Sequence, residues 1–210
     1  MPTIVPRTNI KAILFDLGKV LLHFNFEPAF RRLSKHCRHS PSEIEDFFIQ
    51  SGLEVLYDGG QISSSVFFQK VSQALGLRSR MSFPTFERIW NNIFTPIPGM
   101  SRLVSQLQKR YRLVLISNTN AMHFSYVRKR YPIIQKFNRC ILSYKEKVRK
   151  PDKRIYRTAA KACLVHPREI FYIDDRADLT QAASELDFNT FTFCDNVTEL
   201  ARTLKKARIL

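Results

Sequence analysis

The spacing of apolar residues changes twice along the 210-residue chain. Near the start, the apolar run Ile13-Leu14-Phe15 breaks at Asp16-Leu17-Gly18, which predicts a buried strand over 10–16 and a tight loop after it. Short β-rich runs return after residue 110 and predict strands over 111–116, 140–143, 169–173 and 190–193. Helical spacing lies around and between them, over 100–109, 154–164, 179–186 and 197–206. This alternation predicts an α/β, Rossmann-like, doubly wound parallel sheet.

The stretch from about 24 to 95 has a different residue pattern, because it lacks β-branched runs and its apolar residues recur at helical spacing. Phe30, Leu33 and Cys37 fit one face of a helix that begins near Pro28. Further helices are expected over 66–75 and 86–94, and residues 95–99 read as a rigid linker. We therefore expect a small all-helical cap, residues 23–96, inserted into a core formed by 1–22 and 97–210.

Two local signals mark helix ends inside this helical segment. Ser40 precedes Pro41, and Glu43 follows at the third helical position, which is the pattern of a capping box. Gly76 stands where the apolar spacing of 66–75 stops, as expected for a helix C-terminus. The many phenylalanines of the segment are interpreted as core packing.

The formal net charge is +16, with 34 Lys and Arg against 18 Asp and Glu. Such a charge favours anionic partners, such as phosphates, nucleic acid or acidic surfaces. The basic residues are scattered along the chain and no nucleic-acid-binding motif is present, so we favour a solvated basic surface and expect no nucleic-acid partner.

Cysteine use and the chain start predict a cytoplasmic protein. The four cysteines form no CxxC pair and are expected to be reduced, mostly buried thiols: Cys37, Cys140, Cys163 and Cys194. Residues 1–9 read as a loose leader without a secretory signal, and no apolar run is long enough to span a membrane. His36 and His39 lack a third ligand and predict no metal site.

Polar residues end three of the predicted strands. Asp16 ends the first strand, Ser117-Asn118 the second, and Asp174-Asp175 the fourth, while Lys150 lies in a basic loop before a helix. Taken alone, each fits a turn or a helix cap as well as a reactive site. Together, at the carboxyl ends of parallel strands, they are expected to face one crevice.

Each of these groups suits phosphoryl transfer. A carboxylate such as Asp16 can attack phosphorus and become an aspartyl-phosphate. Clustered carboxylates need a cation, and Mg²⁺ prefers oxygen ligands. Ser117, the main-chain amide of Asn118, and Lys150 can bind the phosphoryl oxygens as charge develops.

The stretches FDLGKVL, LISNTN, RKPDKRIY and YIDDRADLTQAA resemble the four motifs of the haloacid-dehalogenase-like (HAD) phosphatases, over residues 10–205. The segment YDGGQIS within the expected cap makes the chain most similar to the bacterial branch that contains an α-glucose-1-phosphate phosphatase. The resemblance implies Asp16 as nucleophile and Mg²⁺ held by Asp16, the carbonyl of Gly18 and Asp175, with Asp174 as a further metal group or support. It also implies phosphate binding by Ser117, Asn118 and Lys150, and a small phosphorylated metabolite as substrate.

Two positions depart from the family pattern. Gly18 stands where most HAD phosphatases have the aspartate that protonates the leaving oxygen, and the glucose-1-phosphate branch shares this glycine. His23 or Asp58 could supply the proton instead, and Tyr57 and Asp58 are expected to set specificity. Leu179 replaces an asparagine common in the branch, which predicts a local change in hydrogen bonding.

Three functions remain open from the sequence. The favoured one is a Mg²⁺-dependent phosphatase of small phosphomonoesters, with sugar phosphates as the expected class. The alternative is a catalytically weak binding or regulatory module for a phosphorylated or anionic partner, which Gly18 and the charge favour. Haloacid dehalogenation would need no metal, and the Asp174-Asp175 pair argues against it, because clustered carboxylates repel one another without a cation.

Overall fold

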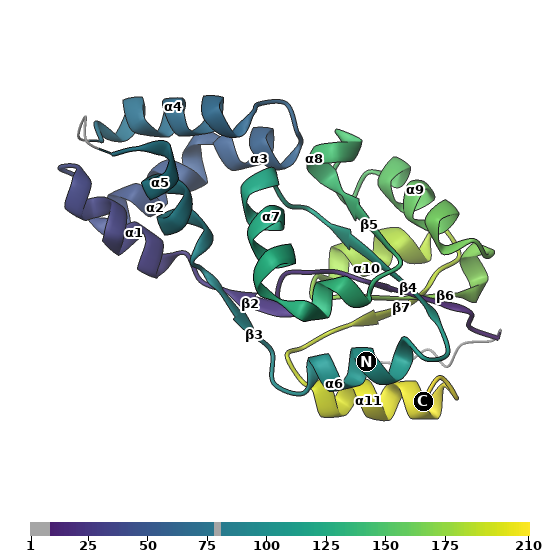
Figure 1. Cartoon of the computed structure of the whole chain (residues 1–210). Coiled ribbons are helices and arrows are strands. Elements are labelled where there is room, and N and C mark those ends of the chain that lie inside the picture. Colours follow the sequence, from purple (N-terminus) through teal and green to yellow (C-terminus); the bar gives the residue numbers. More distant parts are fainter. Residues whose placement is uncertain (1–8, 78–80) are drawn as a thin grey trace.

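Figure 1 shows the computed structural model, which describes residues 9–77 and 81–210 and has a sheet-based lobe beside a helical lobe. Within those ranges, five strands pair in parallel in the order β5-β4-β1-β6-β7. Their bounds are β1 Ala12–Phe15, β4 Arg112–Ser117, β5 Arg139–Leu142, β6 Ile170–Asp174 and β7 Asn189–Thr192. The predicted doubly wound parallel sheet is confirmed.

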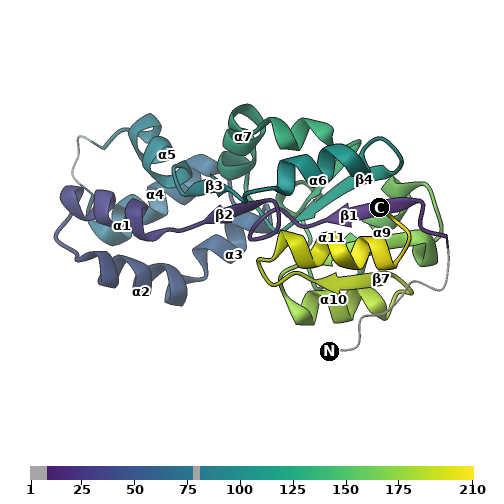
Figure 2. The same ribbon diagram turned by 90° about the horizontal axis from the view of Figure 1, so that it is seen from below.

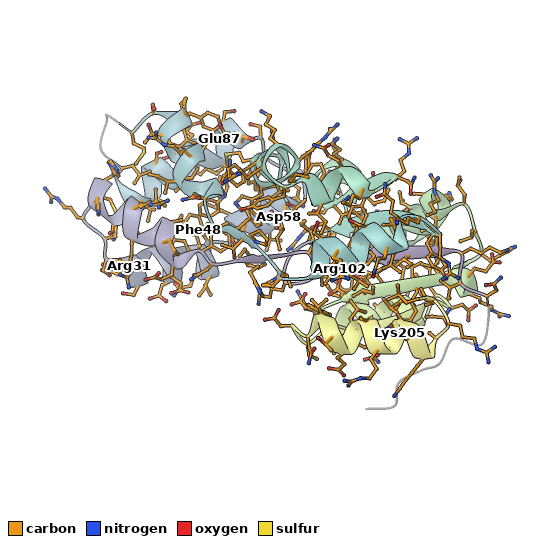
Figure 3. All side chains as sticks on the ribbon, turned by 60° about the horizontal axis from the view of Figure 1, so that its bottom comes forward. Arg31, Phe48, Asp58, Glu87, Arg102 and Lys205 are labelled. Carbon is orange, nitrogen blue, oxygen red and sulfur yellow. The ribbon has the colours of Figure 1, made fainter. Side chains whose placement is uncertain are left out.

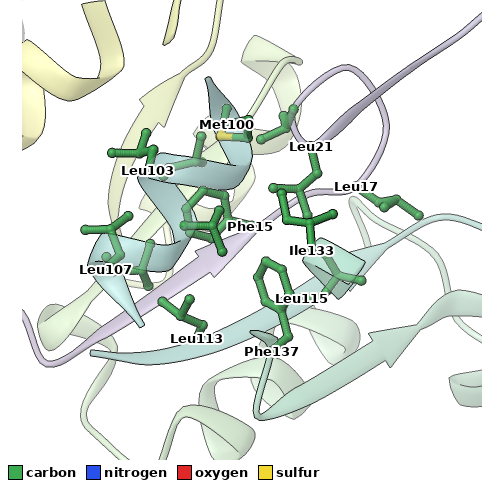
Figure 4. Packing of buried hydrophobic residues seen from close by; sticks show 14 of the residues in the cluster. Phe15, Leu17, Leu21, Met100, Leu103, Leu107, Leu113, Leu115, Ile133 and Phe137 are labelled. Carbon is green, nitrogen blue, oxygen red and sulfur yellow. The ribbon is translucent and has the colours of Figure 1, made fainter. Parts of the chain in front are cut away.

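Helices cover both faces of this sheet. On one face, Ile13 and Phe15 of β1 pack in a cluster with α6, α7 and α11. Figure 4 shows Phe15 of this cluster beside Met100, Leu103 and Leu107 of α6. On the other face, Ala12 and Leu14 pack with α9 and α10. The bounds are α6 Met100–Leu107, α7 Ala121–Arg130, α9 Lys153–Cys163, α10 Ala177–Ser184 and α11 Val197–Lys206. Burial on both faces explains why β1 is apolar throughout and does not alternate.

The helical lobe is built from α1 to α5 (Figure 2). Their bounds are α1 Glu27–Leu33, α2 Pro41–Ser51, α3 Leu53–Asp58, α4 Ser64–Leu75 and α5 Phe83–Asn91. The capping box of Ser40 and Glu43 is formed, and Gly76 ends α4 in the left-handed conformation, as predicted. Cys37 was wrongly assigned to the first helix, because α1 ends at Leu33 and a 3₁₀ turn, Ser34–His36, follows.

Aromatic rings form the interior of the helical lobe. The ring centroids of Phe48, Phe67 and Phe86 lie 4.7, 5.3 and 5.8 Å from that of the fully buried Trp90. Figure 3 shows Phe48 within this lobe. The phenylalanine-rich pattern therefore reports core packing, as expected, and such ring pairs add to the area that they bury.

A two-stranded antiparallel ribbon joins the lobes. It consists of β2 Leu22–Phe24 and β3 Phe94–Pro96, with Phe24 opposite Phe94. The expected helix over 86–94 is wrong at its end, since α5 stops at Asn91 and Phe94 belongs to a strand. The local spacing of apolar residues could not reveal this ribbon, because the two strands lie at opposite ends of the inserted helical segment along the chain.

Several short elements were not predicted. They are α3 and α7, the single turn α8 Ser143–Glu146, and the 3₁₀ turns Pro132–Lys136 and Pro167–Glu169. Of the expected leader, all but Asn9 lies outside the described residues. No helix formed by residues 9–77 and 81–210 has the length and apolar character needed to cross a membrane.

The cysteines carry no disulfide among themselves, since all four are free thiols. The expectation that most are buried is wrong. Cys163 is buried, whereas Cys37 and Cys140 are half-buried and Cys194 is exposed.

Candidate functional site

The carboxyl ends of β1, β4 and β6 bring the predicted polar residues together. They surround a hollow of about 270 Å³, here called the strand-end hollow, lined by Asp16, Gly18, Ser117, Asn118, Lys150 and Asp175. Asp16 follows the central strand, and its main-chain N–H donates to the carbonyl of Ile173 at 2.9 Å, which continues the pairing of β1 with β6. The crevice at the carboxyl ends of the sheet is thus where the sequence places it.

Lys150 is the buried cation of the strand-end hollow. Its ammonium donates to Asp16 at 2.8 Å and to Asp174 at 2.6 Å. Asn118 fixes its backbone, since the N–H of Lys150 donates to Oδ1 of Asn118 at 2.8 Å and Nδ2 of Asn118 donates to the Lys150 carbonyl at 3.0 Å. Burial acts to lower the pKa of Lys150, but the two carboxylates outweigh burial and hold it above its ordinary value. Lys150 is therefore a permanent positive charge beside Asp16.

Asp174 lies beneath the hollow and is fully buried. Its Oδ2 accepts hydrogen bonds from Lys150 and from the hydroxyl of Tyr172, and its Oδ1 accepts from the N–H of Arg176 at 3.0 Å. These bonds join the Lys150 loop to the end of β6 and to the turn that follows it. Asp174 thereby orients Lys150 toward Asp16.

Asp16, Asp174 and Asp175 form a carboxylate cluster. One oxygen from each lies within 4.8 Å of the others, and among the described residues this is the only such group of three or more possible metal ligands. Burial, opposed by Lys150 and reinforced by Asp174, raises the pKa of Asp16 to about 7. Burial and the charge of Asp174 also raise the pKa of Asp175. A hard divalent cation with oxygen ligands, such as Mg²⁺, would offset the repulsion within this cluster and favour the ionised carboxylates.

A second space, the inter-lobe cavity, opens from the strand-end hollow toward the helical lobe. Its volume is about 180 Å³, and it shares Gly18, Phe24, Ser117 and Asn118 with the hollow. Glu54 and Asp58, one helical turn apart on α3, line it from the helical lobe. The group attached to a phosphate in the hollow would therefore face two carboxyl groups.

Asp58 joins α3 to the sheet-based lobe and lies between the lobes in Figure 3. Its Oδ1 accepts from Nδ2 of Asn120 at 3.0 Å, and its carbonyl accepts from the hydroxyl of Ser143 at 2.5 Å. Two residues on, Gly60 has φ +66°, and a Cβ there would lie 2.1 Å from the carbonyl oxygen of Tyr144. Only glycine permits this close contact between the lobes.

Tyr57 and His23 do not line the inter-lobe cavity. Tyr57 is buried, bonds Ser64 at 2.6 Å and accepts from the N–H of Met122 at 3.1 Å, so it joins the lobes. His23 lies 3.5 Å from Asp195 and lines a surface hollow that shares Lys19, Phe24 and Asp175 with the strand-end hollow. Because Tyr57 does not line the inter-lobe cavity, this geometry gives no support to the expectation that Tyr57 sets specificity.

Gly18 is constrained by an aromatic ring rather than by its backbone. Its φ lies outside the left-handed region, but a Cβ at this position would lie 2.8 Å from the ring of Phe24. The ring of Phe24 thus occupies the space into which a side chain at position 18 would extend. Leu179, the other departure, is buried, lines the strand-end hollow, and its carbonyl accepts from the Tyr156 hydroxyl at 3.1 Å.

Sequence reasoning missed three residues that line the inter-lobe cavity: Glu54, Asn120 and His123. His123 is buried, its Nδ1 is 3.1 Å from Nδ2 of Asn120, and its Nε2 is 3.3 Å from the carbonyl of Trp90. Burial lowers its pKa to about 4, so the ring is neutral near pH 7. The one available signal was helical spacing, since Glu54 precedes Asp58 by four positions.

Comparisons with known proteins find relatives of this chain and solved structures with the same fold. The chain is 24% identical over 190 residues to a D-ribitol-5-phosphate phosphatase of Bacteroides thetaiotaomicron, which covers 87% of this chain and 91% of that protein. An HAD family enzyme of the same organism, solved with magnesium and inorganic phosphate, is 26% identical with a TM-score of 0.82, over 91% of this chain and 99% of that one. The L-2-haloacid dehalogenase of Xanthobacter autotrophicus is 19% identical with a TM-score of 0.65 and covers 96% and 84% of the two chains, which shows a shared fold alone.

The family model described as haloacid dehalogenase-like hydrolase matches residues 10–187, most of the chain. This match spans Asp16, Ser117, Lys150 and Asp175, and it includes the helical lobe between them. The chain therefore belongs to the haloacid dehalogenase-like hydrolases.

Proposed function

We propose that the protein is a Mg²⁺-dependent phosphatase that hydrolyses small phosphomonoesters, with sugar or sugar-alcohol phosphates as its substrate class. The observation that carries the proposal is the buried Lys150 ammonium, which lies 2.8 Å from Asp16 in a hollow that Ser117 and Asn118 also line. A nucleophilic carboxylate, a fixed cation and hydrogen-bond donors around one space suit phosphoryl transfer. The similarity to a D-ribitol-5-phosphate phosphatase supports the substrate class.

In this proposal the reaction proceeds through Asp16 in two steps. A carboxylate oxygen of Asp16 attacks phosphorus, the bond from phosphorus to the leaving oxygen breaks, and the phosphoryl group is left on Asp16 as an aspartyl-phosphate. Water then attacks phosphorus, and phosphate leaves with Asp16 restored. Ser117, the main-chain amide of Asn118, and Lys150 bind the phosphoryl oxygens and stabilise their charge in both steps.

The carboxylate cluster fits a magnesium ion. We assign Asp16, Asp175 and the carbonyl of Gly18 as its ligands. Asp174, whose oxygens already accept three hydrogen bonds, supports the ligand set from below. When bound, Mg²⁺ neutralises charge and aligns the phosphoryl group. Ser117, Asn118 and Lys150 would hold the phosphoryl group of the substrate beside the metal ion.

The helical lobe is assigned the role of a cap. Its α3 supplies Glu54 and Asp58 to the inter-lobe cavity, so the lobe contacts the part of the substrate that is not phosphate. The cavity has no lysine or arginine among its described lining residues, whereas the strand-end hollow has Lys150. This division favours an uncharged, hydroxyl-bearing leaving group over one with a second phosphate or carboxylate.

Phosphate release from a panel of esters tests the proposal. The panel contains ribitol-5-phosphate, glucose-1-phosphate, glucose-6-phosphate, a nucleotide and a phosphoamino acid, each with and without Mg²⁺. We expect Mg²⁺-dependent turnover that is highest for the sugar and sugar-alcohol esters and is lost in Asp16→Asn by about 10⁴-fold or more.

The control is the melting temperature of Asp16→Asn, which should stay close to that of the unaltered protein. If Asp16→Asn kept its activity, the mechanism would be wrong. A folded protein that turned over no ester would instead favour a binding module for a phosphorylated ligand.

A further inference from the structure

We propose that Glu54 of the helical lobe is the proton donor and acceptor that most HAD phosphatases place two residues after the nucleophile. The inference rests on the proposed phosphatase function. It also names a catalytic residue that no sequence motif indicates.

The sheet-based lobe cannot supply this proton from position 18. Gly18 has no side chain, and the Phe24 ring lies where its Cβ would project, at 2.8 Å. Phe24 also lines both the strand-end hollow and the inter-lobe cavity. A donor to the leaving oxygen must therefore come from another wall of the cavity.

Among the described lining residues of the inter-lobe cavity, the ionisable side chains are Glu54, Asp58 and His123. His123 is excluded because both ring nitrogens have partners, Asn120 and the Trp90 carbonyl, and because burial lowers its pKa to about 4. It is a neutral ring that packs between the lobes.

Asp58 is also committed to other groups. Its Oδ1 accepts from Asn120 at 3.0 Å, and its Oδ2 lies 4.0 Å from the guanidinium of Arg149. A carboxylate held by an amide and a nearby cation has a structural task and little freedom to follow a leaving group.

Burial also raises the pKa of Asp58, to about 6, so Glu54 differs from Asp58 in its hydrogen bonding and not in the direction of its pKa shift. Within the part of the chain that the structure describes, no donor hydrogen-bonds to its carboxyl group, although it lies half-buried in the cavity wall. Burial, reinforced by the charge of Asp58 and opposed by Arg149, raises its pKa to about 7. A carboxyl group with such a pKa is available in both protonation states near neutral pH, as general acid–base catalysis requires.

The proton balance closes over the two steps. In the first, Asp16 attacks phosphorus, the bond to the leaving oxygen breaks, and the Glu54 carboxyl gives its proton to that oxygen, which leaves as an alcohol. In the second, the Glu54 carboxylate takes a proton from the attacking water as its oxygen bonds to phosphorus. Asp16 is released and Glu54 is again protonated.

The test compares leaving groups in Glu54→Gln, which preserves size and removes the titrating group. For ribitol-5-phosphate, whose alkoxide is a poor leaving group, we expect kcat/KM to fall by about 10²–10⁴-fold. For 4-nitrophenyl phosphate, whose phenolate leaves without a proton, we expect the first step to survive. Because the second step lacks its base, a burst of nitrophenolate should appear, with a protein species heavier by one phosphoryl group in the mass spectrum.

Glu45→Gln is the matched control. Because Glu45 lies exposed on α2, this variant should leave kcat/KM unchanged for both substrates. Equal loss of kcat/KM on both substrates, or full activity with ribitol-5-phosphate, would overturn the assignment of Glu54. No Mg²⁺-dependent turnover of either ester by the unaltered protein would instead overturn the proposed function, and the assignment with it. Thermal melting of Glu54→Gln, and the same assays on Glu54→Asp, distinguish lost chemistry from lost folding.

Discussion

The ionisable side chains on the two walls of the space between the lobes differ in their burial and in their hydrogen bonding. On the sheet side, Asp16 and Asp174 are buried, and each accepts a hydrogen bond from the buried Lys150 ammonium, at 2.8 and 2.6 Å. On the helical side, Glu54 has no hydrogen-bond partner among the described residues and is only half-buried. The sheet wall therefore holds its ionisable groups in place through the ion pairs of Lys150, while the helical wall leaves one carboxyl group free to move.

The largest expected effect on stability comes from removing the cation of the sheet side. Lys150→Met leaves Asp16 and Asp174 buried without their shared partner, and breaking such a buried pair costs about 3–5 kcal/mol of unfolding free energy. Phosphate release should also fall by about 10²–10³-fold, as for the loss of one donor to the reacting group. Urea unfolding and phosphate release measure the two losses.

Lys153→Met is the control for that variant. Lys153 pairs with Glu185 at 2.9 Å, but both side chains are 51% exposed. Exposed pairs contribute less than about 1 kcal/mol. Equal destabilisation by the two variants would show that burial of the Lys150 pairs has no special weight.

The unfolding free energy of the protein should fall in acid because of His123, which lies buried between the lobes. Its pKa of about 4 lies below its ordinary 6.5, so the unfolded chain binds the proton more readily than the folded one. The stabilisation is complete above pH 6.5 and is lost as the pH falls through 4, by up to about 3 kcal/mol.

The prediction is checked by urea unfolding of the unaltered protein and His123→Phe at several pH values between 7.5 and 4. The difference in their unfolding free energies should move in favour of the phenylalanine variant as the pH falls. Carboxyl groups with raised pKa values act in the opposite direction, but they are common to both proteins. A difference that stays constant with pH would contradict the neutral state of His123.

Mg²⁺ should stabilise the folded protein through its ligands in the sheet-based lobe. At a hundred times its Kd, a ligand that binds only the folded state adds about 2.7 kcal/mol. We expect Mg²⁺ to raise the Tm of the unaltered protein and to have little effect on Asp175→Asn. Asp178→Asn is the control, because Asp178 is exposed and pairs with Arg176 at 2.6 Å. If Asp175→Asn kept the full shift, Asp175 would not be a ligand.

The smallest expected effect tests whether the sheet side could accept an acid. Gly18→Asp brings a Cβ within 2.8 Å of the Phe24 ring, which must move, at a cost of about 1–2 kcal/mol. Adding Phe24→Leu should recover part of that loss, as measured by urea unfolding. If Gly18→Asp alone left stability unchanged, the Phe24 ring would not restrict this position.

Much of the fold could be predicted because its signals are local. The continuous apolar run of β1, the capping box at Ser40 and the glycine after α4 each reflect interactions within a few residues. The β2–β3 ribbon could not be predicted, since Phe94 gains its strand partner Phe24 from a distant part of the chain.

The candidate site divides in the same way. Asp16, Ser117, Lys150 and Asp175 stand at strand ends or in the loop between them, so the order of the elements brings them together. Glu54 reaches the cavity only because the ribbon and the Asp58 contacts set α3 over the sheet edge. Its place depends on tertiary packing, for which spacing along the chain gives no signal.

The β2–β3 ribbon has a consequence for how fast the sheet can form. Ala12 of β1 pairs with Arg112 of β4, a closure of about a hundred residues, whereas the ribbon sets Leu22 opposite Pro96. Once the helical lobe and its ribbon have formed, the effective loop between β1 and β4 is about a quarter as long. Since each doubling of loop length costs about 0.6 kcal/mol of closure entropy, a ribbon that forms before β1 and β4 pair lowers the cost of that pairing by about 1 kcal/mol. The inserted lobe therefore shortens the search by which the central strands of the sheet meet.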